Sequence, residues 1–156
     1  MIYTLPRKIS FLEGDMFLPN GSPLYEVRRI PGGAFIYNLR GGTIAQIFRT
    51  DNGARISIAD LGSIDVTVGS DGVKIARLIV EHKGHGRSLE PVEYIFHGNY
   101  RTSHYQIYEK KSGEIKPELI ITVAPHPINE KTVNARVEDG VNVLRATLMV
   151  LAISLL

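Results

Sequence analysis

Residues 141–156, VNVLRATLMVLAISLL, decide the fold of this chain. From residue 146 onward only Thr147 and Ser154 carry polar side-chain atoms, and neither proline nor glycine interrupts the run. The stretch predicts a helix of about four turns, a core helix over residues 140–156, that is apolar on every side. A helix without a polar face must be surrounded either by lipid or by the rest of its own domain.

A bilayer is the poorer of these two environments. At about 1.5 Å per residue the stretch is roughly 24 Å long, whereas a bilayer core needs about 20 apolar residues. Asn142 and Arg145 also lie inside it. We therefore expect a buried core helix rather than a membrane anchor. The large apolar side chains expected in the core are those of Val141, Val143, Leu144, Leu148, Met149, Val150, Leu151, Ile153, Leu155 and Leu156.

The composition is that of an ordinary globular protein. The 156 residues are 44% hydrophobic and 22% charged, which predicts a single domain over residues 1–156. A net charge of +2 argues against a nucleic-acid binder, and the absence of cysteine excludes disulfides and thiolate metal sites. The N-terminus has no basic segment followed by an apolar one, so we expect no secretory signal and a cytoplasmic location.

Most of the chain before residue 138 alternates between apolar and polar residues, with turn residues at short intervals. Ile64, Val66 and Val68, for example, alternate with Asp65 and Thr67. Similar runs, separated by glycine-rich turns, predict ten to twelve antiparallel strands with one apolar face. Such strands need something apolar to cover, and the helix needs something to cover it. A mainly β fold follows, a closed antiparallel β-barrel around a buried C-terminal α-helix, which also removes exposed strand edges.

The start of the helix carries two adjacent acids. Glu138 and Asp139 stand where the helix is expected to begin. Acidic side chains accept from the free N–H groups there and oppose the positive end of the helix dipole, so we expect them to cap it.

The order of these segments resembles that of a known family. The segments are PLYEVRR, GAFIYNL, GTIAQIF, ARISIAD, VKIARLIV, YIFHGNY, HYQIYEK and ELIITV, followed by ARVEDGVNVLRATLMVLAISLL. From about residue 23 to the end the chain is similar to the LURP-one-related proteins, which belong with tubby C-terminal domains and phospholipid scramblases. The resemblance implies a barrel of about twelve strands threaded by the C-terminal helix, without a shared catalytic centre. Tubby domains bind phosphoinositide head groups through a basic groove, and scramblases associate with membranes.

The segment HKGHGR, residues 82–87, is the most suggestive loop. Its glycines, with Lys83 and Arg87, could hold an anion on backbone N–H groups, and His82 and His85 could ligate a metal. The alternative is a solvated turn between strands, which we favour; we predict no metal site.

Two pairs of adjacent cations, Arg28 with Arg29 and Lys110 with Lys111, fall on predicted strands or strand ends. Neighbours on a strand point to opposite faces, so one residue of each pair could face inward. The pairs either protect strand edges from aggregation or help draw an anionic lipid or phosphate to one end of the barrel.

Arg145 places a permanent charge one turn into the expected core helix. Either it extends out of the barrel end or pairs with an acid such as Glu138, or it marks the entrance of a binding cavity.

Motifs for nucleophilic or nucleotide chemistry are absent from the sequence, so we predict neither an enzyme nor a cofactor. The leading hypothesis is a non-enzymatic binding or scaffold module, peripheral to the membrane, that attaches to anionic phospholipid through basic residues. The alternative is a barrel that binds a protein partner or a small ligand in a pocket near Arg145. An enzyme would require the histidines and acids to converge.

Overall fold

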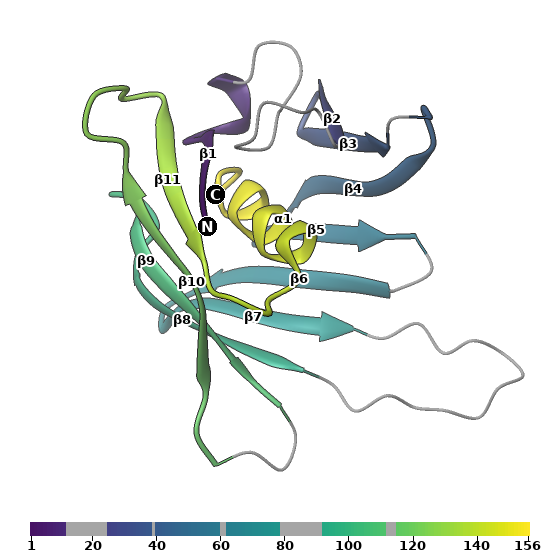
Figure 1. Cartoon of the computed structure of the whole chain (residues 1–156). Helices are drawn as coiled ribbons and strands as arrows, with labels where there is room; N and C mark the ends of the chain where they lie inside the picture. The colour runs from purple at the N-terminus through teal and green to yellow at the C-terminus, as the bar shows by residue number, and fades with distance from the viewer. Residues whose placement is uncertain (12–24, 39, 60–61, 79–91, 112–114) are drawn as a thin grey trace, which may run out of the picture.

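The computed structural model describes residues 1–11, 25–38, 40–59, 62–78, 92–111 and 115–156 (Figure 1). These residues form one large antiparallel sheet, a short 3-10 helix η1 (Ile9–Phe11) and one α-helix, α1 (Val143–Ile153). The eleven strands are β1 (Ile2–Pro6), β2 (Tyr25–Ile30), β3 (Gly33–Asn38), β4 (Thr43–Thr50), β5 (Gly53–Ile58), β6 (Gly62–Gly69), β7 (Gly72–Leu78), β8 (Glu93–Asn99), β9 (His104–Lys110), β10 (Glu118–Pro125) and β11 (Thr132–Val137). The prediction of a mainly β chain ending in a single helix is confirmed.

Each strand from β2 to β11 pairs with its sequence neighbour, and β1 pairs with β11. The order in the sheet is therefore β1-β11-β10-β9-β8-β7-β6-β5-β4-β3-β2. This arrangement leaves β1 and β2 at the two edges, and no ladder of hydrogen bonds joins them among the strands that the structure describes. The sheet is thus a long curved meander that its hydrogen bonds do not close into a barrel.

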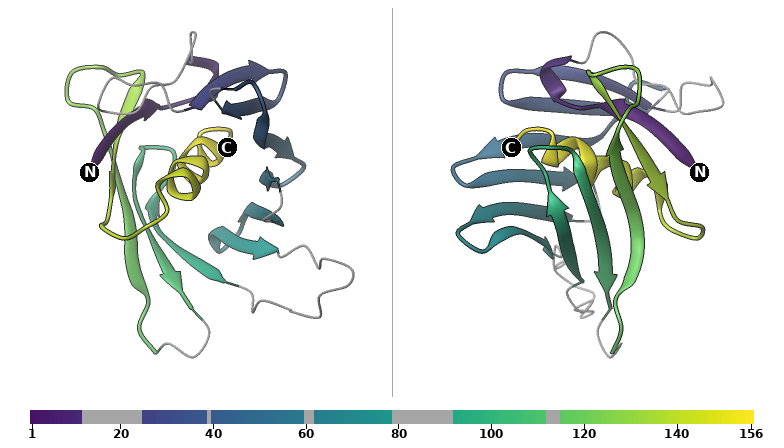
Figure 2. Two further views of the ribbon diagram at one scale, coloured as in Figure 1. Left: turned by 45° about the vertical axis from the view of Figure 1, so that its right-hand side comes forward. Right: turned by 90° about the vertical axis from the view of Figure 1, so that its left-hand side faces the viewer.

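The sheet curls around α1, which lies against its concave face (Figures 1 and 2). The helix contacts β4 and β5 on one side and β1 and β11 on the other. The eight consecutive helix residues from Ala146 to Ile153 are all buried. The prediction of a buried core helix is confirmed for these residues, whereas four of the apolar side chains expected in the core are only partly buried: Val141, Val143, Leu144 and Leu156. No helix in the described part of the chain combines the length and the apolar character needed to cross a membrane.

Alternation along the strands supplies the rest of the core. In β6, Ile64 and Val66 are at most 1% exposed, while Asp65 and Thr67, which alternate with them, remain partly accessible. Strand β10 departs from this rule because its register with β9 shifts between Leu119 and Ile121. This bulge buries both Ile120 and Ile121, which are neighbours in sequence, and leaves Leu119 only partly buried.

The helix begins later than expected and carries a different cap. Asn142 is the N-cap, and its Oδ1 accepts a hydrogen bond of 3.0 Å from the backbone N–H of Arg145. The first turn contains no acid, so the prediction that Glu138 and Asp139 cap the helix is wrong. Gly140, with φ +80°, turns the chain between the acids and the helix, and the acids therefore precede the N-cap rather than forming it.

Tyr105 faces inward from β9 and is 6% exposed. Burial raises the pKa of its hydroxyl above the value of about 10 that a tyrosine has in an unfolded chain. Above pH 10 the unfolded chain therefore loses this proton while the folded chain keeps it. The contribution of the neutral hydroxyl to stability is fully present below pH 10 and falls by about 1.4 kcal/mol per pH unit above it.

We expect Tyr105→Phe to remove this loss. The measurement is urea unfolding of the parent protein and of Tyr105→Phe between pH 8 and pH 11. The difference between their free energies of unfolding should stay constant up to about pH 10. Above that pH the free energy should fall more steeply for the parent protein. Parallel curves for the two proteins across the whole pH range would contradict the prediction.

Candidate functional site

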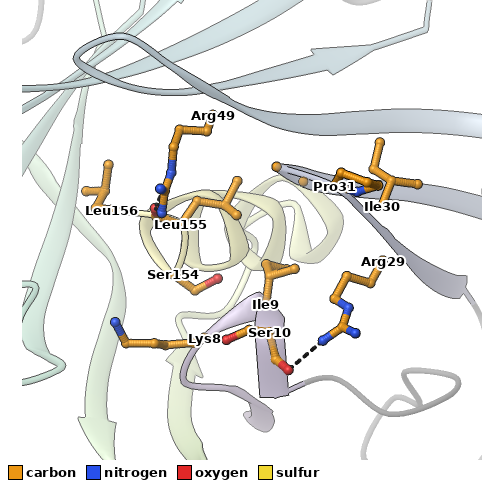
Figure 3. A pocket seen from close by; sticks show the side chains of 12 residues that line it. Lys8, Ile9, Ser10, Arg29, Ile30, Pro31, Arg49, Ser154, Leu155 and Leu156 are labelled. Atoms are coloured by element: carbon orange, nitrogen blue, oxygen red, sulfur yellow. Dashed lines mark hydrogen bonds between the residues drawn. The ribbon is translucent and has the colours of Figure 1, made fainter.

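A pocket of about 410 Å3 opens where α1 ends (Figure 3). Its wall comes from parts of the chain that are far apart in sequence: η1, the turn between β2 and β3, the end of β4 and the last residues after α1. The lining residues are Lys8, Ile9, Ser10, Arg29, Ile30, Pro31, Gly32, Gly33, Arg49, Ser154, Leu155 and Leu156. Three of them are cations, and among the described residues that line it there is no aspartate or glutamate.

Arg49 reaches the end of the helix because of its place in β4. It follows the buried residues Ala45 and Ile47 at intervals of two and therefore points to the concave face. Its Nε donates to the carbonyl oxygen of Leu155 at 3.1 Å, and its Nη2 donates to the same oxygen. An arginine in this position satisfies a free carbonyl and offsets the negative end of the helix dipole.

Arg29 approaches the pocket from β2. It shares the concave face with Val27, which is 2% exposed, and its Nη1 donates to the carbonyl oxygen of Ser10 at 2.7 Å. This bond joins the edge strand β2 to η1, which follows the other edge strand, β1. Figure 3 shows the Arg29 guanidinium directed at Ser10, whereas the Lys8 side chain extends in the other direction, away from Arg29.

A second pocket, of about 370 Å3, lies beside the first and shares Arg49, Leu155 and Leu156 with it. Its other lining residues include Asp51 and Tyr100, and the guanidinium of Arg101 lies 5.7 Å from the centre of the Tyr100 ring. Arg49 therefore stands between two hollows of different character. The first is lined by cations without an acidic side chain, whereas the second contains the carboxylate of Asp51.

The structure separates the cations that the sequence singled out. Of Arg28 and Arg29, only Arg29 lines either of the two pockets described above, as expected for neighbours on opposite faces of a strand. Arg28 lies on the convex face, 3.1 Å from the Glu26 carboxylate and 5.2 Å from the centre of the Tyr37 ring. Lys83 and Arg87, together with His82 and His85, lie outside the described residues.

Lys110 and Lys111 are exposed at the far end of β9. The near end of this strand follows the turn that contains Tyr100, a residue of the second pocket. Seven residues of strand span roughly 20 Å, so the two lysines are remote from the pockets. The Lys111 ammonium lies 4.0 Å from the Glu109 carboxylate.

Arg145 is half-buried in the first turn of α1. It lines neither of the two pockets, which lie at the other end of the helix. Its predicted ion pair with Glu138 is not among those that the described residues form. Neither of these two pockets is the one near Arg145 that the sequence suggested, and that pocket stays a prediction.

Two of the three cations of the pocket, Lys8 and Arg49, were missed by the sequence analysis. Arg49 had a usable signal, because it continues the inward alternation of Ala45 and Ile47. Lys8 lies between β1 and η1, outside any periodic segment, and offered none.

No family model, curated protein or solved structure matches this chain. In the parts of the chain that the structure describes, no three histidine, aspartate or glutamate side chains lie close enough together to hold a metal ion. The side chains available at the pocket are therefore those of three cations, two serines and several apolar residues, and the hydroxyl of one serine, Ser154, donates to the Leu151 carbonyl.

Proposed function

We propose that this protein is a non-enzymatic binding module that attaches to anionic membrane surfaces at the end of the sheet where α1 ends. The observation that carries the proposal is the gathering of Lys8, Arg29 and Arg49 around one pocket. The proposal is supported by the resemblance of the strand order to the LURP-one-related, tubby and scramblase superfamily. The same resemblance supports a tubby-like barrel, in which the edge strands β1 and β2 come together. We place the module at the cytoplasmic face of a membrane.

Electrostatics favours this end of the molecule for such a contact. Each lysine or arginine close to an anionic bilayer contributes about 1 kcal/mol, and the attraction falls off within a Debye length, about 8 Å at physiological salt. Lys8 and Arg29 are exposed and contribute directly. Arg49 also bonds to Leu155, so part of its charge offsets the helix dipole.

Vesicle co-sedimentation tests the proposal. We expect binding to vesicles that contain phosphatidylserine, weaker binding as salt rises, and little binding to pure phosphatidylcholine. The double variant Lys8→Gln/Arg29→Gln should bind about 30-fold more weakly, since two charges contribute about 2 kcal/mol. Equal binding to neutral and anionic vesicles, insensitive to salt, would exclude electrostatic attachment.

The matched control removes the same amount of charge elsewhere. Arg28→Gln/Lys74→Gln changes two exposed cations on the convex face of the sheet. If surface attachment uses the pocket end, this control should keep nearly all of the binding. A similar loss in both double variants would mean that net charge, and not this end of the molecule, governs attachment.

A second candidate function, binding of a small ligand, is favoured by the size of the pocket. A volume of about 410 Å3 lies within the range of about 300–1,000 Å3 that is usual for ligand sites. Ile9, Ile30 and Leu156 give it an apolar portion beside its cations.

A further inference from the structure

We infer that the second pocket binds a free α-amino acid with an apolar side chain, whose carboxylate pairs with Arg49 and whose ammonium pairs with Asp51. The inference goes beyond the proposed function, because it concerns a ligand in solution and does not depend on attachment to a membrane. The observation that carries it is the presence of one cation and one anion in a hollow that is otherwise lined in part by apolar side chains.

Arg49 retains hydrogen-bond donors for a ligand. A guanidinium has five N–H donors. Arg49 uses two of them, one on Nε and one on Nη2, for the carbonyl oxygen of Leu155, so three remain. Figure 3 shows its guanidinium beside Leu155 and Leu156, and these three residues line both pockets. Because the bonds to Leu155 already hold the side chain in place, binding of a carboxylate costs little further side-chain entropy.

Asp51 supplies the opposite charge from the turn between β4 and β5. The pairing of Thr50 with Gly53 closes this two-residue turn, and the Asn52 carbonyl accepts a hydrogen bond of 2.7 Å from the backbone N–H of Val68. The backbone of the turn is therefore anchored to both β5 and β6. Among the described residues, no side chain or backbone group forms a hydrogen bond or an ion pair with the Asp51 carboxylate. The carboxylate is thus available to an ammonium group.

The balance of charges favours a zwitterion over a simple ion. Among the described residues that line this pocket, Arg49 and Asp51 carry the full charges, one of each sign. A ligand with only a carboxylate would meet the Asp51 charge without compensation, and a ligand with only an ammonium would meet that of Arg49. An α-amino acid at neutral pH carries both groups on one carbon atom. Arg49 and Asp51 are two residues apart, roughly 7 Å of extended chain, so both can reach such a ligand at the same time.

The rest of the pocket indicates the kind of side chain that the amino acid carries. Val68, Leu155 and Leu156 line the pocket, together with Tyr100, which packs against the core. An apolar side chain such as that of leucine leaves water when it contacts these residues, which favours leucine over glycine. The volume of about 370 Å3 lies within the range of about 300–1,000 Å3 that is usual for ligand sites.

Isothermal titration of the full chain with L-leucine tests the inference, with three related compounds for comparison. N-acetyl-leucine lacks the ammonium, leucinamide lacks the carboxylate, and glycine lacks the apolar side chain. We expect saturable binding of leucine with one site per chain, and an affinity about tenfold lower or less for each of the three compounds, since each loses one of the expected contacts. Equal affinity for leucine and any one of these compounds, or no saturable binding of leucine, would overturn the inference.

Asp51→Asn tests the partner of the ammonium. This change should weaken the binding of leucine about tenfold and should not weaken that of N-acetyl-leucine, which has no ammonium to lose a partner. Asp71→Asn is the matched control, because Asp71 is exposed in the two-residue turn between β6 and β7 and lines neither pocket. It should leave leucine binding unchanged. Equal effects of the two changes on leucine binding would overturn the assignment of the ammonium to Asp51.

Arg49→Gln tests the partner of the carboxylate through a ratio of affinities. Arg49 also holds the end of α1 through its bonds to Leu155, so its replacement weakens the site in general as well as removing the contact with the ligand. The ratio of the affinities for leucine and leucinamide within one protein is insensitive to the general effect. We expect this ratio to fall from about ten or more in the parent protein to near one in Arg49→Gln. A ratio as large as that of the parent would contradict the pairing of Arg49 with the carboxylate.

Discussion

Replacing Leu151 with aspartate is expected to leave the chain without a cooperative fold. Leu151 is 0% exposed in the middle of the buried run of α1. Loss of a core leucine side chain costs about 2–5 kcal/mol. The aspartate adds the cost of burying a carboxylate among apolar side chains, which amounts to several kcal/mol more. The sum is comparable to the whole net stability of a typical domain, about 5–15 kcal/mol.

Circular dichroism and urea unfolding measure this effect. Leu151→Ala should retain the fold with a free energy of unfolding lower by about 2–5 kcal/mol. Ile128→Asp is the control, because Ile128 is 87% exposed in the turn between β10 and β11 and should tolerate the same charge. A cooperative Leu151→Asp protein as stable as the Ile128→Asp protein would mean that α1 is not the core around which the sheet folds.

The helix and the strands could be predicted because each is decided by a periodicity that is local in sequence. A helical run without a polar face had to be buried, and α1 is buried. Strands with alternating apolar residues such as Ile64 and Val66 had to turn one face inward, and these two side chains are buried. Closure of the sheet is not decided in this way. It depends on whether β1 and β2, which lie 19 or more residues apart, come into register, and alternation within a strand carries no information about a distant partner.

The pocket was only partly predictable, for a related reason. Its three cations come from three separate elements, and the sequence does not show which charges the curvature of the sheet will bring together. Arg29 was identified as one of a pair, and the rule that strand neighbours face opposite ways correctly implied that one of the two points inward. The predicted cap of α1 was wrong because the chain turns at Gly140, which has a positive φ, and the helix therefore begins after the two acids.

Glycines illustrate a further limit, because the residue type was noticed but its physical role was not. Gly53 follows Asp51 and Asn52, and this combination of residues is typical of a turn. In the structure it is the first residue of β5, and its φ is not among the positive values of the described residues. A side chain there would have to occupy the place of the Val66 carbonyl oxygen on the neighbouring strand β6. Gly33, at the start of β3, has the same relation to the Ile47 carbonyl of β4.

Gly53→Ala is therefore expected to lower the free energy of unfolding by about 3 kcal/mol or more. The added methyl group can be accommodated only if backbone moves, which costs overpacking strain and hydrogen bonds between β5 and β6. Gly69→Ala is the matched control, since Gly69 ends β6 and a methyl group there meets nothing within 4 Å. Its free energy should change by less than about 1 kcal/mol, with a small gain if the backbone suits alanine. Urea unfolding of both variants and of the parent protein tests this prediction. Equal free energies of unfolding for Gly53→Ala and Gly69→Ala would contradict the close approach of β5 and β6 at Gly53.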